Sequence, residues 1–200
     1  MPSVVAICNA AMRKVGATTI TSLSQGTKNA NFCNDRYADL RDALLESHPW
    51  NFAMKRVKLA QTTATPAIKF DNTYALPADF IRVLSVYDSD EGFGIVDHKV
   101  EGNTIVCSAS EVWLLYISLV TDPNKMSPLF REALAGSIAI EAATALVESR
   151  TLRELMLAEF KQLNRRARSS DAMSDLPDRM PAGSWVTERS GRLTSRRWSW

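Results

Sequence analysis

The stretch that decides the fold runs from residue 127 to residue 147 and reads SPLFREALAGSIAIEAATALV. Ser127 followed by Pro128 is typical of a helix start, because a serine oxygen can cap free N–H groups and proline suits the first helical position. The apolar positions after it are too many for a single stripe. They are Phe130, Leu134, Ile138, Ala142, Ala145 and Leu146, widened by Ala133, Ile140 and Val147. The pattern predicts a helix that is packed on several sides.

Three more helices are expected around this one. Ser3 can cap a helix near the start of the sequence, and Gly16 can close it in the left-handed conformation. A second helix stops before Pro49, because proline disfavours a helical conformation in the residue before it. Its inward positions are Ala30, Cys33, Tyr37, Leu40 and Leu44, and its other faces carry Asp35, Arg36, Asp39, Asp42 and Glu46. The fourth helix covers residues 151 to about 169, with Leu152, Leu155, Met156, Phe160, Leu163 and Ala167 inward.

Between these pairs of helices the hydrophobic period changes to that of strands. Val57 and Leu59 alternate with basic residues, and Gly102-Asn103 precedes a β-branched run, as is typical of a hairpin turn. Short strands from about residue 57 to residue 119 therefore predict a small antiparallel meander or sandwich.

Together these elements predict an α+β fold. We expect a four-helix bundle core with an inserted small antiparallel β domain and an extended C-terminal arm. Residues 1–54 and 121–170 would supply the bundle, residues 55–120 the β domain and residues 171–200 the arm.

The expected arm differs in composition from the rest of the chain. It holds prolines, glycines, five arginines and three of the five tryptophans. Tryptophan is rare in solvated disordered segments, and Arg and Trp are the residues that most often anchor interfaces. We therefore interpret it as a binding arm, not as a frayed basic tail. The residues expected to make its contacts are Trp185, Arg189, Arg192, Arg196, Arg197, Trp198 and Trp200.

Composition argues against most enzymes and against a dedicated nucleic-acid binder. Twenty-four basic and 22 acidic residues give a net charge of +2, without the concentrated basic charge that duplex binding needs. Three widely spaced cysteines fit a reducing compartment better than a disulfide scaffold or zinc site. The longest apolar run, residues 112–117, is too short to cross a bilayer, and the first residues predict no signal sequence. We expect no metal, cofactor, membrane segment or enzyme activity.

Three local features leave chemistry open. Glu141 stands alone on the apolar helix and could act as an acid, although a buried or interfacial carboxylate paired with an arginine is the preferred interpretation. His48, before Pro49, is interpreted as a histidine at a helix end. The run from Arg165 to Arg168 could touch DNA, but a cationic helix C-terminus is favoured because it complements the helix dipole.

Several short motifs are specific as an ordered set. They are Val15-Gly16, Ile20-Thr21-Ser22-Leu23, Pro49-Trp50-Asn51-Phe52-Ala53, the run from Tyr74 to Leu84, and Asp122-Pro123-Asn124-Lys125-Met126-Ser127-Pro128-Leu129-Phe130. This series resembles the tail tubular protein A family of short-tailed phages, over about Ser3 to Met173.

The resemblance implies a structural virion protein, the head-to-tail adaptor. In that family twelve subunits form a ring beneath the portal protein, and the tail nozzle, formed by a tail tubular protein B-like protein, docks on the far side. Such a ring helps retain the packaged genome and forms part of the conduit through which double-stranded DNA is ejected. The resemblance further implies synthesis in the host cytoplasm, a place in the neck of the virion tail and a portal contact through the C-terminal segment. It leaves open a contact with a tail fibre.

A closed ring needs contacts between two different faces of neighbouring subunits. The alanine-rich helix permits close helix approach and is the expected contact. Its expected interface residues are Phe130, Leu134, Ile138, Glu141 and Ala145.

Two other classes remain open. A tail-associated hydrolase of envelope or polysaccharide would lose activity on peptidoglycan in the Glu141→Gln variant while still assembling. A DNA-associated module would bind duplex DNA with a steep salt dependence.

Overall fold

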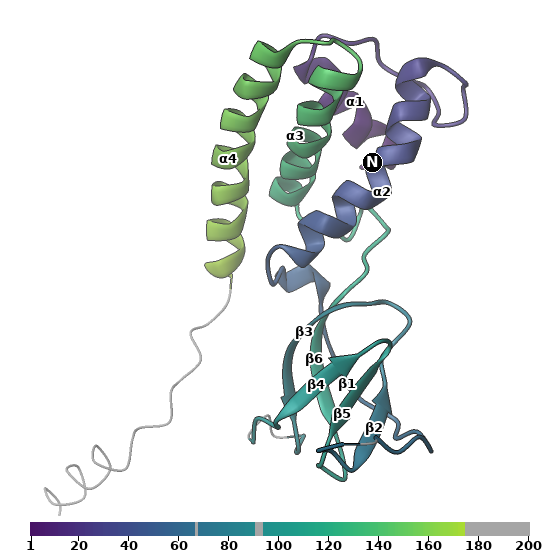
Figure 1. Ribbon diagram of the computed structural model, residues 1–200. Coiled ribbons are helices and arrows are strands. Elements are labelled where there is room, and N and C mark those ends of the chain that lie inside the picture. The colour runs from purple at the N-terminus through teal and green to yellow at the C-terminus, as the bar shows by residue number, and fades with distance from the viewer. Residues whose placement is uncertain (67, 91–93, 175–200) are drawn as a thin grey trace, which may run out of the picture.

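The computed structural model describes residues 1–66, 68–90 and 94–174, which form two lobes stacked end to end (Figure 1). The helical lobe contains α1 (Val4–Lys14), α2 (Lys28–Glu46), α3 (Pro128–Ala145) and α4 (Arg150–Ala172). A short 3-10 helix, η1 (Asn51–Ala53), leads from α2 into the β lobe. The β lobe contains β1 (Met54–Lys58), β2 (Asn72–Ala75), β3 (Phe80–Tyr87), β4 (His98–Glu101), β5 (Thr104–Cys107) and β6 (Trp113–Ser118).

Helix α3 is the central helix, as its composition predicts. The Ser127 hydroxyl accepts a hydrogen bond from the Phe130 N–H at 3.2 Å, and Pro128 occupies the first turn. The exposed positions of the helix are confined to its ends and one side. They are Pro128, Glu132, Thr144 and Ala145. Helices α1, α2 and α4 cover the other sides, so the prediction of a helix packed on several sides is confirmed.

The α+β class holds, but the expected four-helix bundle core is wrong. In a four-helix bundle each helix packs on two neighbours around a shared axis. Here the extensive helix–helix contacts within the described residues all involve α3, with α4 on one side of it and α2 on the other (Figure 1). Because α3 is apolar almost all round, it takes the central position itself and the other three helices surround it.

The ends of α1 and α2 follow from local sequence. Ser3 caps α1 by accepting the Ala6 N–H at 3.1 Å, and Gly16 follows it with a φ of 70°. That left-handed conformation costs glycine little, which is why glycine commonly closes helices. Thr27 caps α2 in the same way, and the helix ends at Glu46, three residues before Pro49. The predicted first and second helices are confirmed.

The β lobe is a sandwich of two three-stranded antiparallel sheets, in the orders β1-β6-β3 and β2-β5-β4. The predicted hairpin joins β4 to β5, with Glu101 opposite Thr104 and a positive φ at Gly102. A glycine at the first position of a two-residue turn is typical of type II′ hairpins. The two inner faces enclose a separate core formed by Leu59, Tyr74, Leu76, Val86, Ile105, Cys107, Val112, Leu114 and Tyr116.

Two segments pass from one sheet to the other and close the corners of this sandwich. After β1, the Leu59 N–H still donates to Val112 next to β6, whereas the Thr62 N–H donates to Thr73 in β2, both at 2.8 Å. Likewise the Val96 N–H donates to Val86 in β3 at 3.0 Å shortly before the chain enters β4. Such corner strands hold the two sheets together through backbone hydrogen bonds as well as through the core.

An aromatic cluster joins the two lobes. Trp50 is fully buried, and its ring meets that of Phe130 edge to face at 5.1 Å between centroids. Phe52 packs on the same Phe130 ring at 5.0 Å, and the Trp50 indole donates to the Leu44 carbonyl at 2.9 Å. Burying a side chain of this size contributes about 3 kcal/mol, so the cluster holds the start of η1 firmly against α3.

Helix α4 is longer than predicted. It runs to Ala172, whereas the sequence indicates an end near Ser169 and an arm from Asp171. Consequently the basic run from Arg165 to Arg168 lies before the last turn, and the interpretation of that run as a helix-end cluster is wrong.

Gly136 tests whether α3 has room at its contact with α4. A Cβ atom added there would lie 3.4 Å from Phe160 and 3.7 Å from Leu163, which is ordinary van der Waals contact. We expect Gly136→Ala to raise the free energy of unfolding in urea by about 0.5–1 kcal/mol, because alanine is the better helix former. Gly136→Leu would overpack the contact and lower that free energy by about 1–3 kcal/mol. Destabilisation by alanine would contradict the described packing.

Candidate functional site

The predicted subunit-interface residues lie mostly inside the chain. Phe130, Leu134 and Ile138 are fully buried in the core of the helical lobe. Their apolar surface is already covered by the subunit's own helices, so it is not available to a neighbour in this conformation. Ala145 is exposed at the end of α3.

Glu141 forms an ion pair within the subunit. Its two oxygens accept from Arg36 of α2, from Nε at 2.6 Å and from Nη2 at 3.0 Å. Arg36 also contacts Asp39 at 3.0 Å, and its hydrogen bond to Glu141 raises the pKa of the guanidinium further. The expected pairing of this carboxylate with an arginine is confirmed. Because both oxygens are occupied, the arrangement ties α2 to α3 and does not present a catalytic acid to solvent.

The predicted portal-binding residues lie outside the described residues. These are Trp185, Arg189, Arg192, Arg196, Arg197, Trp198 and Trp200. What the structure does describe is the point from which that segment continues, at the end of α4.

The end of α4 is fastened to η1. The Asp171 carboxylate accepts the Asn51 backbone N–H at 3.0 Å, and the Asn51 side-chain amide donates to the Asp171 carbonyl at 2.8 Å. The Asp171 side chain is only 9% exposed. This reciprocal pair, which we call the α4 clamp, joins residues 120 positions apart and fixes where the chain leaves the helical lobe.

His48 lies beside the α4 clamp. Its Nε2 is 3.6 Å from the Asp171 carboxylate, and its ring packs edge to face on Trp50 at 4.7 Å between centroids. Burial lowers the pKa of His48; Asp171 opposes that shift, while Arg168 and Arg82 add to it. The histidine is therefore held in its neutral form at a pH where a free histidine begins to take up a proton.

Arg168 contributes to the same junction. Its Nη2 donates to the backbone carbonyl and the hydroxyl of Ser47, at 3.2 and 3.1 Å. Arg168, which belongs to the run considered above as a DNA contact, thus joins the ends of α2 and α4.

A second polar network lies where the β lobe meets the junction. Asp79 accepts from the Lys55 ammonium at 2.5 Å and from the Tyr116 hydroxyl at 2.9 Å, which links β1, the start of β3 and β6. Burial would raise the pKa of Asp79, but the hydrogen bonds from Lys55 and Tyr116 lower it overall. Burial and the bond to Asp79 raise the pKa of Tyr116 to about 12. Both shifts favour the ionisation states that keep the network intact at neutral pH.

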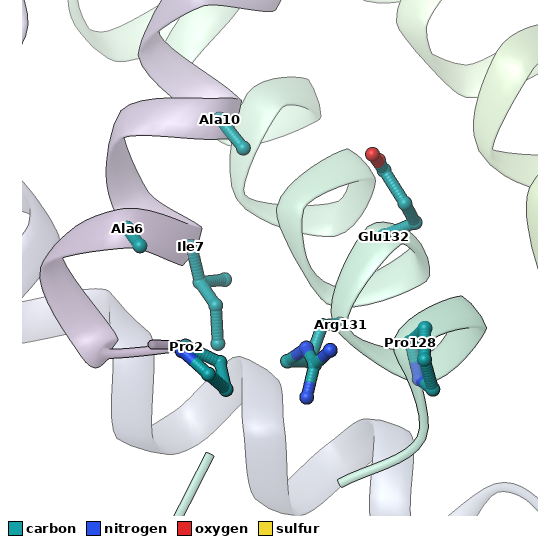
Figure 2. A pocket seen from close by; sticks show the side chains of 7 residues that line it. All are labelled: Pro2, Ala6, Ile7, Ala10, Pro128, Arg131 and Glu132. Atoms are coloured by element: carbon teal, nitrogen blue, oxygen red, sulfur yellow. The ribbon is translucent and has the colours of Figure 1, made fainter. Parts of the chain in front are cut away.

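A pocket of about 300 Å³ lies between α1 and the start of α3 (Figure 2). In this view Arg131 lies between Pro2 and Pro128, and Glu132 lies on α3 across the pocket from Ala10 on α1. Arg131 is fixed by donating through Nη1 to the carbonyls of Pro123 and Met126, at 3.0 and 2.9 Å. The lining is mainly apolar and suits the packing of a side chain better than the chemistry of a substrate.

The described residues hold neither a group of three or more potential metal-ligating side chains nor a helix long and apolar enough to cross a membrane. The three cysteines are free thiols and are buried.

Sequence reasoning missed Asn51 and Asp171. In the sequence Asn51 is one member of a short motif, and Asp171 falls in the expected arm. Their pairing depends on how α4 lies against η1, and polar residues this far apart in the sequence carry no periodic signal that would identify it.

Asp171→Ala tests the α4 clamp. The change leaves the Asn51 N–H without its acceptor, so we expect a loss of about 1–3 kcal/mol in the free energy of unfolding. Glu154→Ala, which removes an exposed carboxylate from the same helix, should change it by less than about 0.5 kcal/mol. Equal effects of the two variants would show that the clamp contributes nothing.

The pH dependence of unfolding tests the environment of His48. Because its pKa is lower in the folded protein than the unfolded value of 6.5, the unfolded chain takes up the proton first as the pH falls. The contribution of neutral His48 to the free energy of unfolding is therefore complete above pH 6.5. It declines as the pH falls from 6.5 towards the pKa of the folded protein. We measure the midpoint of urea unfolding as a function of pH. The decline of the midpoint below pH 6.5 that His48 causes should be absent in His48→Gln, whereas the matched control His98→Gln should retain it. An unchanged slope in His48→Gln would contradict the described burial.

Comparison with models of known protein families and with curated proteins finds no match for this chain. The resemblance to tail tubular protein A therefore stays a prediction from the order of the sequence motifs, and no family membership is assigned.

Proposed function

We propose that this protein is a structural subunit of a phage head-to-tail joint. Several copies, twelve by the resemblance, would form a ring between the portal protein and the tail nozzle, through which DNA passes on ejection. It would have no enzymatic role in this assembly and would act in the neck of the virion tail.

The observation that carries this proposal is the fixed departure point of the C-terminal segment. The α4 clamp holds Asp171 against Asn51 at the boundary between the lobes (Figure 1). Beyond Ser174, the last described residue, the sequence continues for 26 residues that include Trp185, Trp198 and Trp200. A binding segment with a fixed origin loses less conformational freedom on binding than one whose base moves as well.

Repetition in a ring supports attachment through such segments. Each segment supplies a modest contact, but many contacts presented on one ring act together and dissociate much more slowly than one. Arginine and tryptophan suit this role, because they pair with carboxylates and fill pockets in a partner. A portal surface that offers acidic side chains and apolar hollows is the expected partner.

The shape of the subunit supports a structural role as well. The two lobes are stacked end to end, and each has its own core. An elongated subunit can contact one partner at each end while its flanks contact copies of itself. The hydrolase alternative receives less support, because its candidate acid, Glu141, is held by Arg36 on both oxygens.

Removal of residues 175–200 tests the proposal. The cut falls after α4 and spares Asp171, so we expect the urea unfolding of the remaining protein to match that of the full chain within about 0.5 kcal/mol. Binding to the portal protein of the same genome, measured by sedimentation of the mixture, should be lost. Retained binding together with normal unfolding would refute the role of the segment.

A milder variant serves as the companion measurement. Replacing Trp185, Trp198 and Trp200 by alanine keeps the length and charge of the segment. It should weaken portal binding by at least about tenfold, because truncated aromatic anchors commonly cost 2 kcal/mol or more. Full binding by this variant would show that the tryptophans are not the anchors.

A further inference from the structure

Helix α2 presents a row of carboxylates to solvent. Asp35, Asp39, Asp42 and Glu46 follow one another at intervals of four, three and four residues, which places them on one side of the helix. The opposite side, with Tyr37, Leu44 and other apolar residues, is buried in the core. We call these four residues the acidic row.

The acidic row is only partly neutralised within the subunit. Asp39 contacts Arg36 at 3.0 Å, and Asp42 contacts Arg41 at 2.7 Å. Neither arginine is free to neutralise the row fully, because Arg36 also pairs with Glu141 through two bonds and the Arg41 side chain is only 10% exposed. Asp35 and Glu46 are exposed and form no ion pair within the described part of the chain. The surface of this side of α2 is therefore anionic.

Helix α4 presents the opposite charge. Lys161 and Arg165, four residues apart on one side of the helix, and the neighbouring Arg166 are exposed and make no ion pair with any described residue. We call these three residues the basic row. The carboxylates of this half of the helix bind partners within the subunit. Glu159 pairs with Lys14 of α1 at 2.6 Å, and Asp171 belongs to the α4 clamp. The outer surface of α4 near its end is therefore cationic.

The two rows lie on different sides of the helical lobe. Helix α4 lies on one side of α3 and α2 on the other (Figure 1). The Glu46 end of the acidic row and the Arg165 end of the basic row also lie at a similar level, because α2 and α4 end close to where Arg168 bonds to Ser47. Two complementary faces at one level favour a closed ring, since joining them requires rotation of the next subunit with little displacement along the axis.

We propose that the acidic row of one subunit docks on the basic row of the next copy of the chain. The inference rests on the proposed function, because a ring of subunits needs one such contact between unlike faces. The expected partner of each row is thus a second copy of this chain.

DNA is the competing occupant of the basic row alone. A duplex would contact Lys161, Arg165 and Arg166 through its phosphates, but it would leave the acidic row on the other side of the lobe uncompensated. Pairing between copies uses both rows and leaves neither charge uncompensated, which favours it over DNA.

A charge-swap experiment tests the proposal. One variant carries Asp35→Lys and Glu46→Lys, and the other carries Lys161→Glu and Arg165→Glu. Each should self-associate at least about a hundredfold more weakly than the wild-type protein, because like charges then face each other across the contact. An equimolar mixture should recover association, since the unchanged basic row of the first variant meets the unchanged acidic row of the second, and the two reversed rows also carry opposite charges. Sedimentation velocity of the full chain at high protein concentration measures this.

Three further observations complete the test. Wild-type association should weaken as salt rises from about 0.1 M to about 1 M, where the Debye length shortens from about 10 Å to about 3 Å. The control, Asp71→Lys with Glu101→Lys in the β lobe, changes the net charge as much as Asp35→Lys with Glu46→Lys does and should associate as the wild type does. Far-ultraviolet circular dichroism and urea unfolding of each variant confirm that it folds.

The contradicting outcomes are distinct. Failure of the mixture to recover association, or a wild-type chain that is monomeric at low salt, would overturn the pairing of the two rows. Loss of duplex binding in Lys161→Glu, Arg165→Glu with unchanged self-association would assign the basic row to DNA instead. Rings on the portal that tolerate both reversals would refute this inference while leaving the proposed function intact, whereas bare portals with every protein would refute the function itself.

Discussion

Helix α3 has apolar side chains in almost every direction, and such a helix is stable in water only when other elements cover it nearly all round. The chain meets this constraint by placing α1, α2 and α4 around it, so that most residues between Phe130 and Ala143 are buried. Each surrounding helix then buries one stripe and leaves its outer side to solvent. What remains for contacts with other molecules is therefore the outer sides of α2 and α4, the β lobe and the segment beyond α4.

A second consequence is the junction between the lobes. The first turn of α3 carries Phe130, and the chain leaving α2 packs Trp50 and Phe52 on that ring before it enters β1. Strand β6 is held there too, because the Ser118 hydroxyl donates to the Ala53 carbonyl at 2.8 Å. The end of α4 is fastened to the same place through Asn51 and Asp171. The point from which the C-terminal segment continues is thus set by the same packing that joins the lobes.

Local signals in the sequence predicted much of the fold. The serine caps Ser3 and Ser127, Gly16, Pro49 and the Gly102 turn mark element ends through interactions within a few residues, and the structure places elements accordingly. The arrangement of helices could not be obtained in this way. An apolar helix indicates burial but not by which partner, which is why Phe130, Leu134 and Ile138 were assigned to a neighbouring subunit although the chain's own helices cover them. The end of α4 was placed too early because Ser169, Ser170 and Asp171 are residues that often leave a helix, whereas the contact of Asp171 with Asn51 stabilises the additional turn.

The site was predictable only where charge patterns are local. The carboxylates of α2 were visible as a polar face, and the basic run of α4 as a cationic segment, but their placement on different sides of one lobe requires the fold.

The proposed adaptor role can be tested most directly by cryo-electron microscopy of the full chain mixed with the portal protein from the same genome. The account predicts a ring of this protein stacked coaxially on the portal, with each subunit's C-terminal segment on the portal surface. Bare portal rings beside unassembled protein would contradict it.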